Sequence, residues 1–94
     1  MNKGRTRFKA AIYEQVARLG KAVSSPGRLE LLDLLAQAPR TVEALAAQIG
    51  QSVANTSHHL QVLRRVQLVD AQKAGLHVTY RLADPGVEIG RAHV

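Results

Sequence analysis

Two adjacent histidines, His58 and His59, are the side chains whose type could bind a metal or transfer a proton. They lie in the segment SVANTSHHLQVLRRV, residues 52–66, which is predicted to be helical. Neighbouring side chains on a helix point about 100° apart. Helical metal-binding pairs are instead spaced four residues apart. The chain also has no cysteine, so thiolate metal sites and disulfides are excluded. We therefore predict neither a metal site nor a cofactor.

Motifs typical of enzymes are missing as well. The sequence contains no cysteine nucleophile, no Gly-rich phosphate-binding loop and no G-x-S-x-G motif. Glu30 and Asp33 share a predicted helix, but they lie on its ordinary polar side. We predict no catalytic residue and a function other than catalysis.

The histidine segment has two distinct faces when it is drawn as a helix. Its inner face carries Val53, Thr56, Leu60 and Leu63, at steps of three, four and three residues. Its outer face carries Ala54, Asn55, His58, Gln61 and Arg65, with Ser57 on the flank. This outer face is small and polar at its start and cationic at its end. Short side chains at the start of a recognition helix permit close approach to the major groove of DNA.

This pattern predicts a DNA-binding surface. Asn and Gln can pair with adenine, and Ser, Thr and His can bond several base edges. Arginines one turn later can contact phosphates. The predicted DNA-binding residues of the segment are Ser52, Ala54, Asn55, Thr56, Ser57, His58, Gln61, Arg64 and Arg65. For His58 and the two arginines, ordinary solvated side chains are the alternative. His59 is interpreted as a packed or hydrogen-bonded structural residue.

The elements that would position this surface are four helices and a β-hairpin. Apolar spacing, with Ser25, Thr41 and Ser52 as N-caps, predicts helices at 8–22, 27–38, 42–49 and 53–66. The last two helices, joined by a short turn at Gly50, have the outline of a helix-turn-helix. Alternating residues then predict strands at 68–73 and 77–82, with Tyr80 facing the core. Lys73 and His77 of this hairpin are predicted to contact DNA as well.

The first predicted helix carries an apolar stripe formed by Phe8, Ile12, Val16 and Leu19. This stripe belongs either to the core or to a dimer interface. We favour a homodimer interface, since a chain of 94 residues would have difficulty covering the stripe alone. The leucines at 29–35 of the second predicted helix, in contrast, are assigned to the core.

Composition limits the class of protein. The chain has 13 Lys and Arg against 7 Asp and Glu, for a net charge of +6, which favours a polyanionic partner. It has neither a signal-peptide pattern nor an apolar run of membrane-spanning length, so a cytoplasmic location is expected. We divide it into a flexible basic N-terminus at 1–7, one domain at 8–84, and an atypical tail at 85–94 that is truncated or foreign.

The order of these motifs resembles the winged helix-turn-helix of ArsR/SmtB-type bacterial repressors. The resemblance covers about residues 13–84. It rests on Pro26 and Arg28 before a Leu-rich helix, on VEALA, on the pattern Ser57–His59–Leu60, and on Tyr80. It implies a mainly α fold with a small β-hairpin, and a dimeric repressor whose fourth helix binds DNA.

The chain also departs from the family pattern. Gln67 stands where the family usually has a glycine before the wing, which predicts an altered turn there. The third helix reads VEALAAQ and lacks the cysteines that sense metals in many members. The C-terminal helix that often completes the dimer is missing or foreign, so dimerisation is expected either to depend on the first helix or to be weakened.

Sequence-specific binding of double-stranded DNA by a transcriptional regulator is therefore the function that the sequence predicts. The alternative is a protein-interaction module that uses the same fold while its basic face is incidental. Binding to an anionic membrane surface ranks third.

Overall fold

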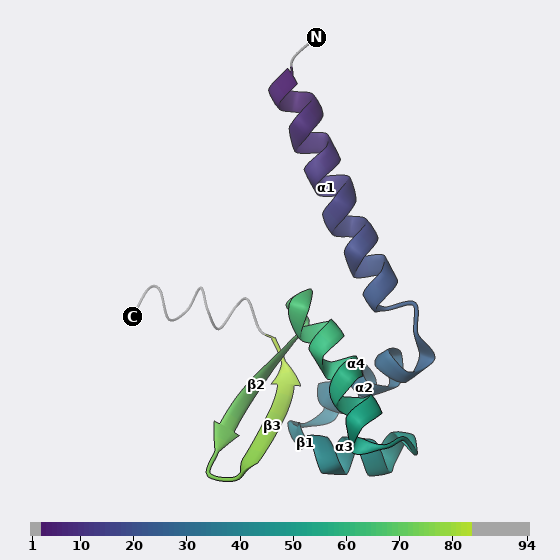
Figure 1. Cartoon of the computed structure of the whole chain (residues 1–94), viewed down its shortest axis with the longest axis vertical. Helices are drawn as coiled ribbons and strands as arrows, with labels where there is room; N and C mark the ends of the chain where they lie inside the picture. Colours follow the sequence, from purple (N-terminus) through teal and green to yellow (C-terminus); the bar gives the residue numbers. More distant parts are fainter. Residues whose placement is uncertain (1–2, 84–94) are drawn as a thin grey trace.

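The computed structural model describes residues 3–83, which form four helices and three short strands (Figure 1). In chain order these are α1 (Lys3–Ala22), α2 (Pro26–Gln37), β1 (Arg40–Thr41), α3 (Val42–Ile49), α4 (Val53–Arg65), β2 (Val69–Ala74) and β3 (His77–Leu82). The predicted mainly α architecture with a hairpin is confirmed. The tail predicted at 85–94 lies outside the described residues.

Two elements differ from the prediction. Helix α1 begins at Lys3 instead of residue 8, so residues 3–7, which were assigned to the N-terminal segment, are helical. Arg and Lys are good helix formers, and they extend the helix beyond its first apolar residue. Strand β1 was not predicted, because two residues are too short to show alternation. It pairs antiparallel with β3 and gives a sheet of order β1-β3-β2.

The core lies between α2, α3, α4 and the sheet. Its buried members are Leu31, Leu35, Leu45, Leu60, Leu63, Val69 and Tyr80. Tyr80 is on the central strand and pairs with Arg40 on one side and Ala71 on the other. Its predicted inward orientation is confirmed, since only 6% of it is exposed.

Two apolar residues predicted for the interior are exposed instead. Leu29 is 51% exposed and Val53 is 45% exposed. Val53 is the first residue of α4, ahead of the buried Thr56. Leu29 lies two residues before the buried Leu31, and it therefore points to roughly the opposite side of α2. The prediction thus assigned too much of each helix surface to the interior.

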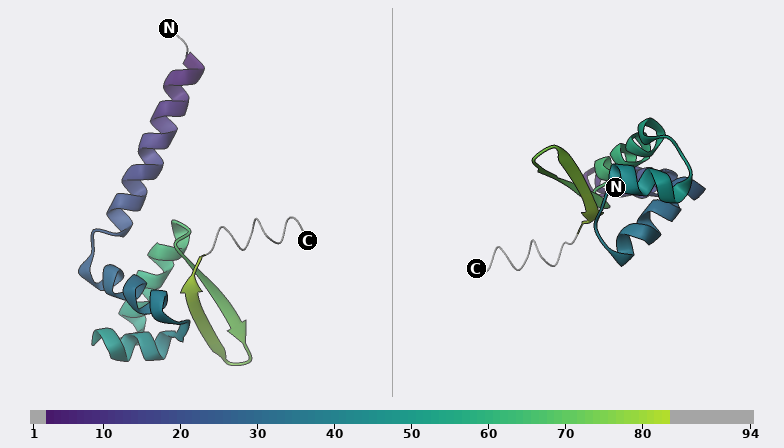
Figure 2. Two further views of the ribbon diagram at one scale, coloured as in Figure 1. Left: turned by 180° about the vertical axis from the view of Figure 1, so that it is seen from behind. Right: turned by 90° about the horizontal axis from the view of Figure 1, so that it is seen from below.

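Helix α1 projects from this body instead of packing on it (Figures 1 and 2). Only Ala22, its last residue, is buried. No helix within residues 3–83 combines the length and apolarity needed to cross a membrane.

Polar caps fix the turn between α3 and α4. Thr41 accepts a hydrogen bond from the Ala44 amide at the start of α3. Gly50 ends α3 in the left-handed conformation, with φ of 68°. Ser52 then accepts a bond from the Asn55 amide and begins α4. The two helices are therefore joined by a turn whose geometry is set locally.

Gln67 ends α4 in a conformation that usually requires glycine. Its φ is 64°, and it is the sole non-glycine residue with positive φ within residues 3–83. The Gln67 amide donates to the Arg64 carbonyl and the Leu68 amide donates to the Leu63 carbonyl. These are the two hydrogen bonds of a Schellman motif, in which Gln67 occupies the usual glycine position. The altered residue at 67 therefore leaves the turn intact but strains the backbone.

We predict that Gln67→Gly stabilises the protein. Glycine removes a left-handed penalty of about 1–2 kcal/mol, partly offset by its greater freedom in the unfolded chain. The free energy of unfolding should rise by about 0.5–1 kcal/mol in urea titrations. Gln72→Gly, on strand β2, is the control and should destabilise the chain. A lower free energy of unfolding for Gln67→Gly than for the wild type would contradict the inference that Gln67 strains the backbone.

Candidate nucleic-acid interface

The outer face of α4 is open to solvent. Ala54, Asn55, His58 and Arg65 are exposed, as predicted, and so is Gln61. Leu60 and Leu63 on the opposite face are fully buried, which fixes the rotation of the helix about its axis. The small polar start and the cationic end of the predicted surface therefore lie on one continuous face of α4.

The prediction that Thr56 contacts DNA is wrong. It is fully buried, and its hydroxyl donates to the Ser52 carbonyl at 2.8 Å. A side chain enclosed in this way cannot contact a base edge. Its position four residues before Leu60 placed it on the inner face, and that inner assignment is the correct one. Ser52 is exposed, but its hydroxyl already accepts the Asn55 amide at 3.0 Å.

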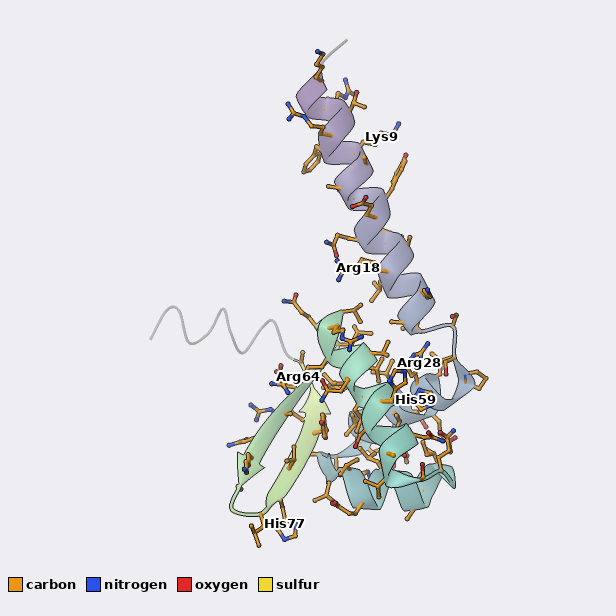
Figure 3. The ribbon with its side chains drawn as sticks, viewed as in Figure 1. Lys9, Arg18, Arg28, His59, Arg64 and His77 are labelled. Atoms are coloured by element: carbon orange, nitrogen blue, oxygen red, sulfur yellow. The ribbon has the colours of Figure 1, made fainter. Side chains whose placement is uncertain are left out.

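The hairpin places the cation Lys73 and the imidazole of His77 near the end of the body where α4 begins. Lys73 and His77 are exposed, and the tip of the hairpin lies at the end of the body away from α1, as does the start of α4 (Figures 1 and 3). Ser57 is half-buried on the flank of α4. Arg64 is exposed where the end of α4 meets the strands (Figure 3). The start of α4 and the hairpin tip therefore lie at one end of the body, whereas Arg64 lies at the opposite end of α4 (Figure 3).

Arg28 connects three helices beside the middle of α4. Its Nε donates to the Ala22 carbonyl, and its Nη2 donates to the Lys21 carbonyl at 3.2 Å. Its Nη1 lies 3.3 Å from Nδ1 of His59 (Figure 3). The end of α1, the start of α2 and the middle of α4 therefore meet at one guanidinium.

His59 is held from two sides at this junction. A guanidinium only donates hydrogen bonds, so the contact with Arg28 requires a neutral imidazole with Nδ1 unprotonated. Burial, then the charges of Arg28 and His58, lower the pKa of His59 below 6.5. On the other side, a methyl group at Gly27 would lie 3.2 Å from Nε2 of His59. The predicted role of His59 as a hydrogen-bonded structural residue is confirmed.

The two histidines do not form a shared site. Their ring centroids are 6.3 Å apart and the rings are tilted by 48°. Within residues 3–83, no group of three His, Cys, Asp or Glu side chains is placed to hold a metal ion. His58 faces outward, whereas His59 faces Arg28.

Sequence reasoning did not find the role of Arg28. One signal was available, because Arg28 is the third residue of α2, where the positive end of the helix dipole disfavours a cation. A glutamate or glutamine at that position would have completed a capping box with Ser25. The unfavourable residue type indicates that Arg28 has a partner outside its own helix.

The apolar stripe of α1 is exposed and separate from the α4 face. Its members are exposed by 69% at Phe8, 43% at Ile12, 62% at Val16 and 41% at Leu19. The alternative in which the stripe belongs to the core of a single chain is therefore wrong. Tyr13, at 62% exposure, adds an aromatic ring that was not predicted.

The sequence matches a known family. Residues 25–71 fit the family described as bacterial regulatory proteins of the arsR family. The transcriptional regulator Rv0324 of Mycobacterium tuberculosis is 44% identical over 84 residues, which cover 89% of this chain and 37% of that protein. The regulator NmtR of the same organism is 38% identical over 88 residues, which cover 89% of this chain and 73% of that protein.

The fold matches solved structures in the same way. One is the homodimeric winged helix-turn-helix DNA-binding domain of Mb0332 from Mycobacterium bovis, a possible ArsR-family regulator. It is 44% identical with a TM-score of 0.77, and the match covers 90% of this chain and 79% of that chain. This chain thus spans little more than a third of Rv0324 but most of the Mb0332 domain.

We predict that His59 makes the stability depend on pH. Its pKa is lowered on folding, so the unfolded chain binds the proton more readily and acid favours unfolding. The free energy of unfolding should decline as the pH falls through 6.5 and continue to decline until the folded pKa is passed. Urea titrations across this range should show a smaller decline for His59→Gln. His77→Gln, at the exposed wing tip, is the control; an unchanged decline in His59→Gln would refute the assignment.

Proposed function

The chain belongs to the ArsR family of bacterial regulatory proteins, and from this we propose that it binds double-stranded DNA sequence-specifically and represses transcription. Repression would follow from occupation of the operator, which blocks access of the transcription machinery. The similar Mb0332 domain is described as DNA-binding, which supports this assignment.

The observation that carries the proposal is the exposed face of α4. Its first two turns present Ala54, Asn55 and His58, and Val53 at the first position is an exposed apolar side chain beside them. Such a surface fits the width of the major groove and leaves amide and imidazole groups to meet base edges. The positive end of the α4 dipole lies at the start of this face and favours the phosphate backbone.

Roles follow from position along this face. We assign Asn55, Ser57, His58 and Gln61 to base edges, and Ala54 to close approach. Arg64, Arg65, Lys73 and His77 lie farther out and are assigned to phosphates. Thr56 instead supports the start of α4 from inside the fold.

We also propose that the chain acts as a homodimer through α1. The described part of α1 exposes four apolar side chains at helical spacing, and nothing within residues 3–83 covers them. Two copies packed along this stripe would remove it from water and place two α4 helices on one DNA duplex. The homodimeric state described for the Mb0332 domain supports this arrangement.

The DNA proposal predicts different effects for base-contacting and phosphate-contacting residues. Duplexes selected by the wild-type protein from a random library would serve as the specific ligand in fluorescence anisotropy titrations. Asn55→Ala and His58→Ala should each reduce the preference for selected over random DNA by about tenfold. Arg65→Ala should weaken both affinities equally and reduce the magnitude of the salt slope by about 0.9 for each phosphate that Arg65 neutralises in the wild type.

Gln48→Ala, at an exposed position of α3, is the matched control and should change neither quantity. If the selected and random duplexes bind equally well to the wild type, specific DNA binding is refuted. The protein-interaction alternative would then become the leading interpretation of the fold.

The dimer proposal predicts a change in mass on charge insertion. Ile12→Asp places a carboxylate in the middle of the α1 stripe, where dimer formation would bury it at high cost. Sedimentation velocity should show a dimer for the wild type and a shift toward monomer for Ile12→Asp. Glu14→Asp, on the polar side of α1, should leave the dimer unchanged. The proposed α1 interface would be contradicted if the wild type is a monomer or if the Ile12→Asp protein remains a dimer.

A further inference from the structure

An open cleft of about 480 Å³ lies between the end of α1, the start of α2 and the second half of α4. Its lining residues are Arg18, Lys21, Ala22, Arg28, His58, Val62, Arg65 and Val66. Four of these eight carry a full positive charge and none is acidic. Figure 3 shows Arg18 on the lower part of α1, above the end of α4, and Arg28 beside α4. The cations therefore come from three different helices and converge on one cavity.

Nothing in the described part of the chain neutralises this charge. Arg28 uses its donors on two carbonyl oxygens and on a neutral imidazole, none of which is an anion. No ion pair to Arg18, Lys21 or Arg65 is formed among residues 3–83. The carbonyl end of α1 offsets only part of the excess, because a helix terminus carries about half an elementary charge.

The charge of Arg28 also acts on the neighbouring His59. The charge of Arg28 contributes to the lowered pKa of His59, after the larger effect of burial. A guanidinium that also holds two backbone carbonyls is fixed in place, so its charge cannot swing away into solvent. The charge of Arg28 is therefore fixed in place. The side chains of Arg18, Lys21 and Arg65 are exposed and can move toward a bound ligand.

The shape and walls of the cleft favour an oxyanion over a simple halide. Guanidinium groups present planar pairs of donors that match the oxygen spacing of phosphates and carboxylates. Val62 and Val66 are half-buried and form an apolar wall along α4. The attraction between several cations and one ligand increases with the ligand's charge, which favours a multiply charged oxyanion.

We propose that this cleft is a phosphate-binding site formed jointly by α1, α2 and α4. The phosphate comes from one of two sources: the backbone of bound DNA, or a small phosphate-bearing ligand. A phosphate from either source would contact both helices and hold the end of α1 against α4. The DNA source rests on the proposed function, whereas the small-ligand source does not depend on it.

The test compares two double variants of the full chain that lose the same charge. Arg18→Gln with Lys21→Gln removes two cations from the cleft. Arg7→Gln with Lys9→Gln removes two exposed cations from the same helix, far from the cleft. Both pairs are on the surface of α1, and dispersed amide spectra would establish that each variant is folded.

In the first arm, inorganic phosphate is titrated into ¹⁵N-labelled protein at constant ionic strength maintained with sodium chloride. For a small ligand we expect saturable shifts at the amides of Lys21, Ala22, Arg28 and Val66. Affinity should fall at least tenfold in the cleft variant and remain unchanged in the matched control.

In the second arm, affinity for random duplex DNA is measured for the same proteins. If backbone phosphate occupies the cleft, affinity falls more for the cleft variant than for the control. A positive result in either arm supports the site and identifies its source. The proposal is overturned if phosphate causes no saturable shift and the two variants lose equal DNA affinity. Failure of the wild type to bind DNA would refute the proposed function, but the phosphate titration would still decide the cleft.

Discussion

Burial of one face of α4 is the constraint on which the surface of the molecule depends. Thr56, Leu60 and Leu63 are fully enclosed by α2, α3 and the sheet. Because they are spaced at helical intervals, their burial determines which side chains of α4 remain in water. The same three residues also connect the stability of the fold to the proposed DNA-binding face. A substitution that weakens their packing would change the orientation of that face or allow it to move.

The junction at Arg28 extends this constraint to the rest of the chain. A single guanidinium ties the last turn of α1 to the start of α2, and it reaches α4 through a neutral imidazole. The absence of a side chain at Gly27 leaves room for that imidazole. The junction of the three helices therefore depends on two backbone carbonyls, on the neutral tautomer of His59 and on the absence of a side chain at Gly27. The helix proposed for the dimer and the helix proposed for DNA binding are mechanically connected at this point.

The sequence was most informative where local chemistry decides structure. Capping and periodicity depend on neighbouring residues. We could therefore predict the bounds of α3, its caps at Thr41 and Gly50, and the outward face of α4. The strand β1 and the contact of Arg28 with His59 could not be predicted, because each joins segments distant in the chain. Thr56 shows the limit within the site: its residue type favoured DNA contact, but its position favoured the core. The burial of position 56 decided between them.

The length of α1 has a consequence for how the protein reaches its final form. Most helical stability in proteins comes from tertiary packing, and only the last residue of α1 is buried in the body. If a second copy covers the stripe, much of the stabilisation of α1 comes from association. Helix content would then depend on protein concentration, with α1 melting upon dilution while α2, α3 and α4 persist. Assembly and the final stage of folding would be one equilibrium, governed by mass action.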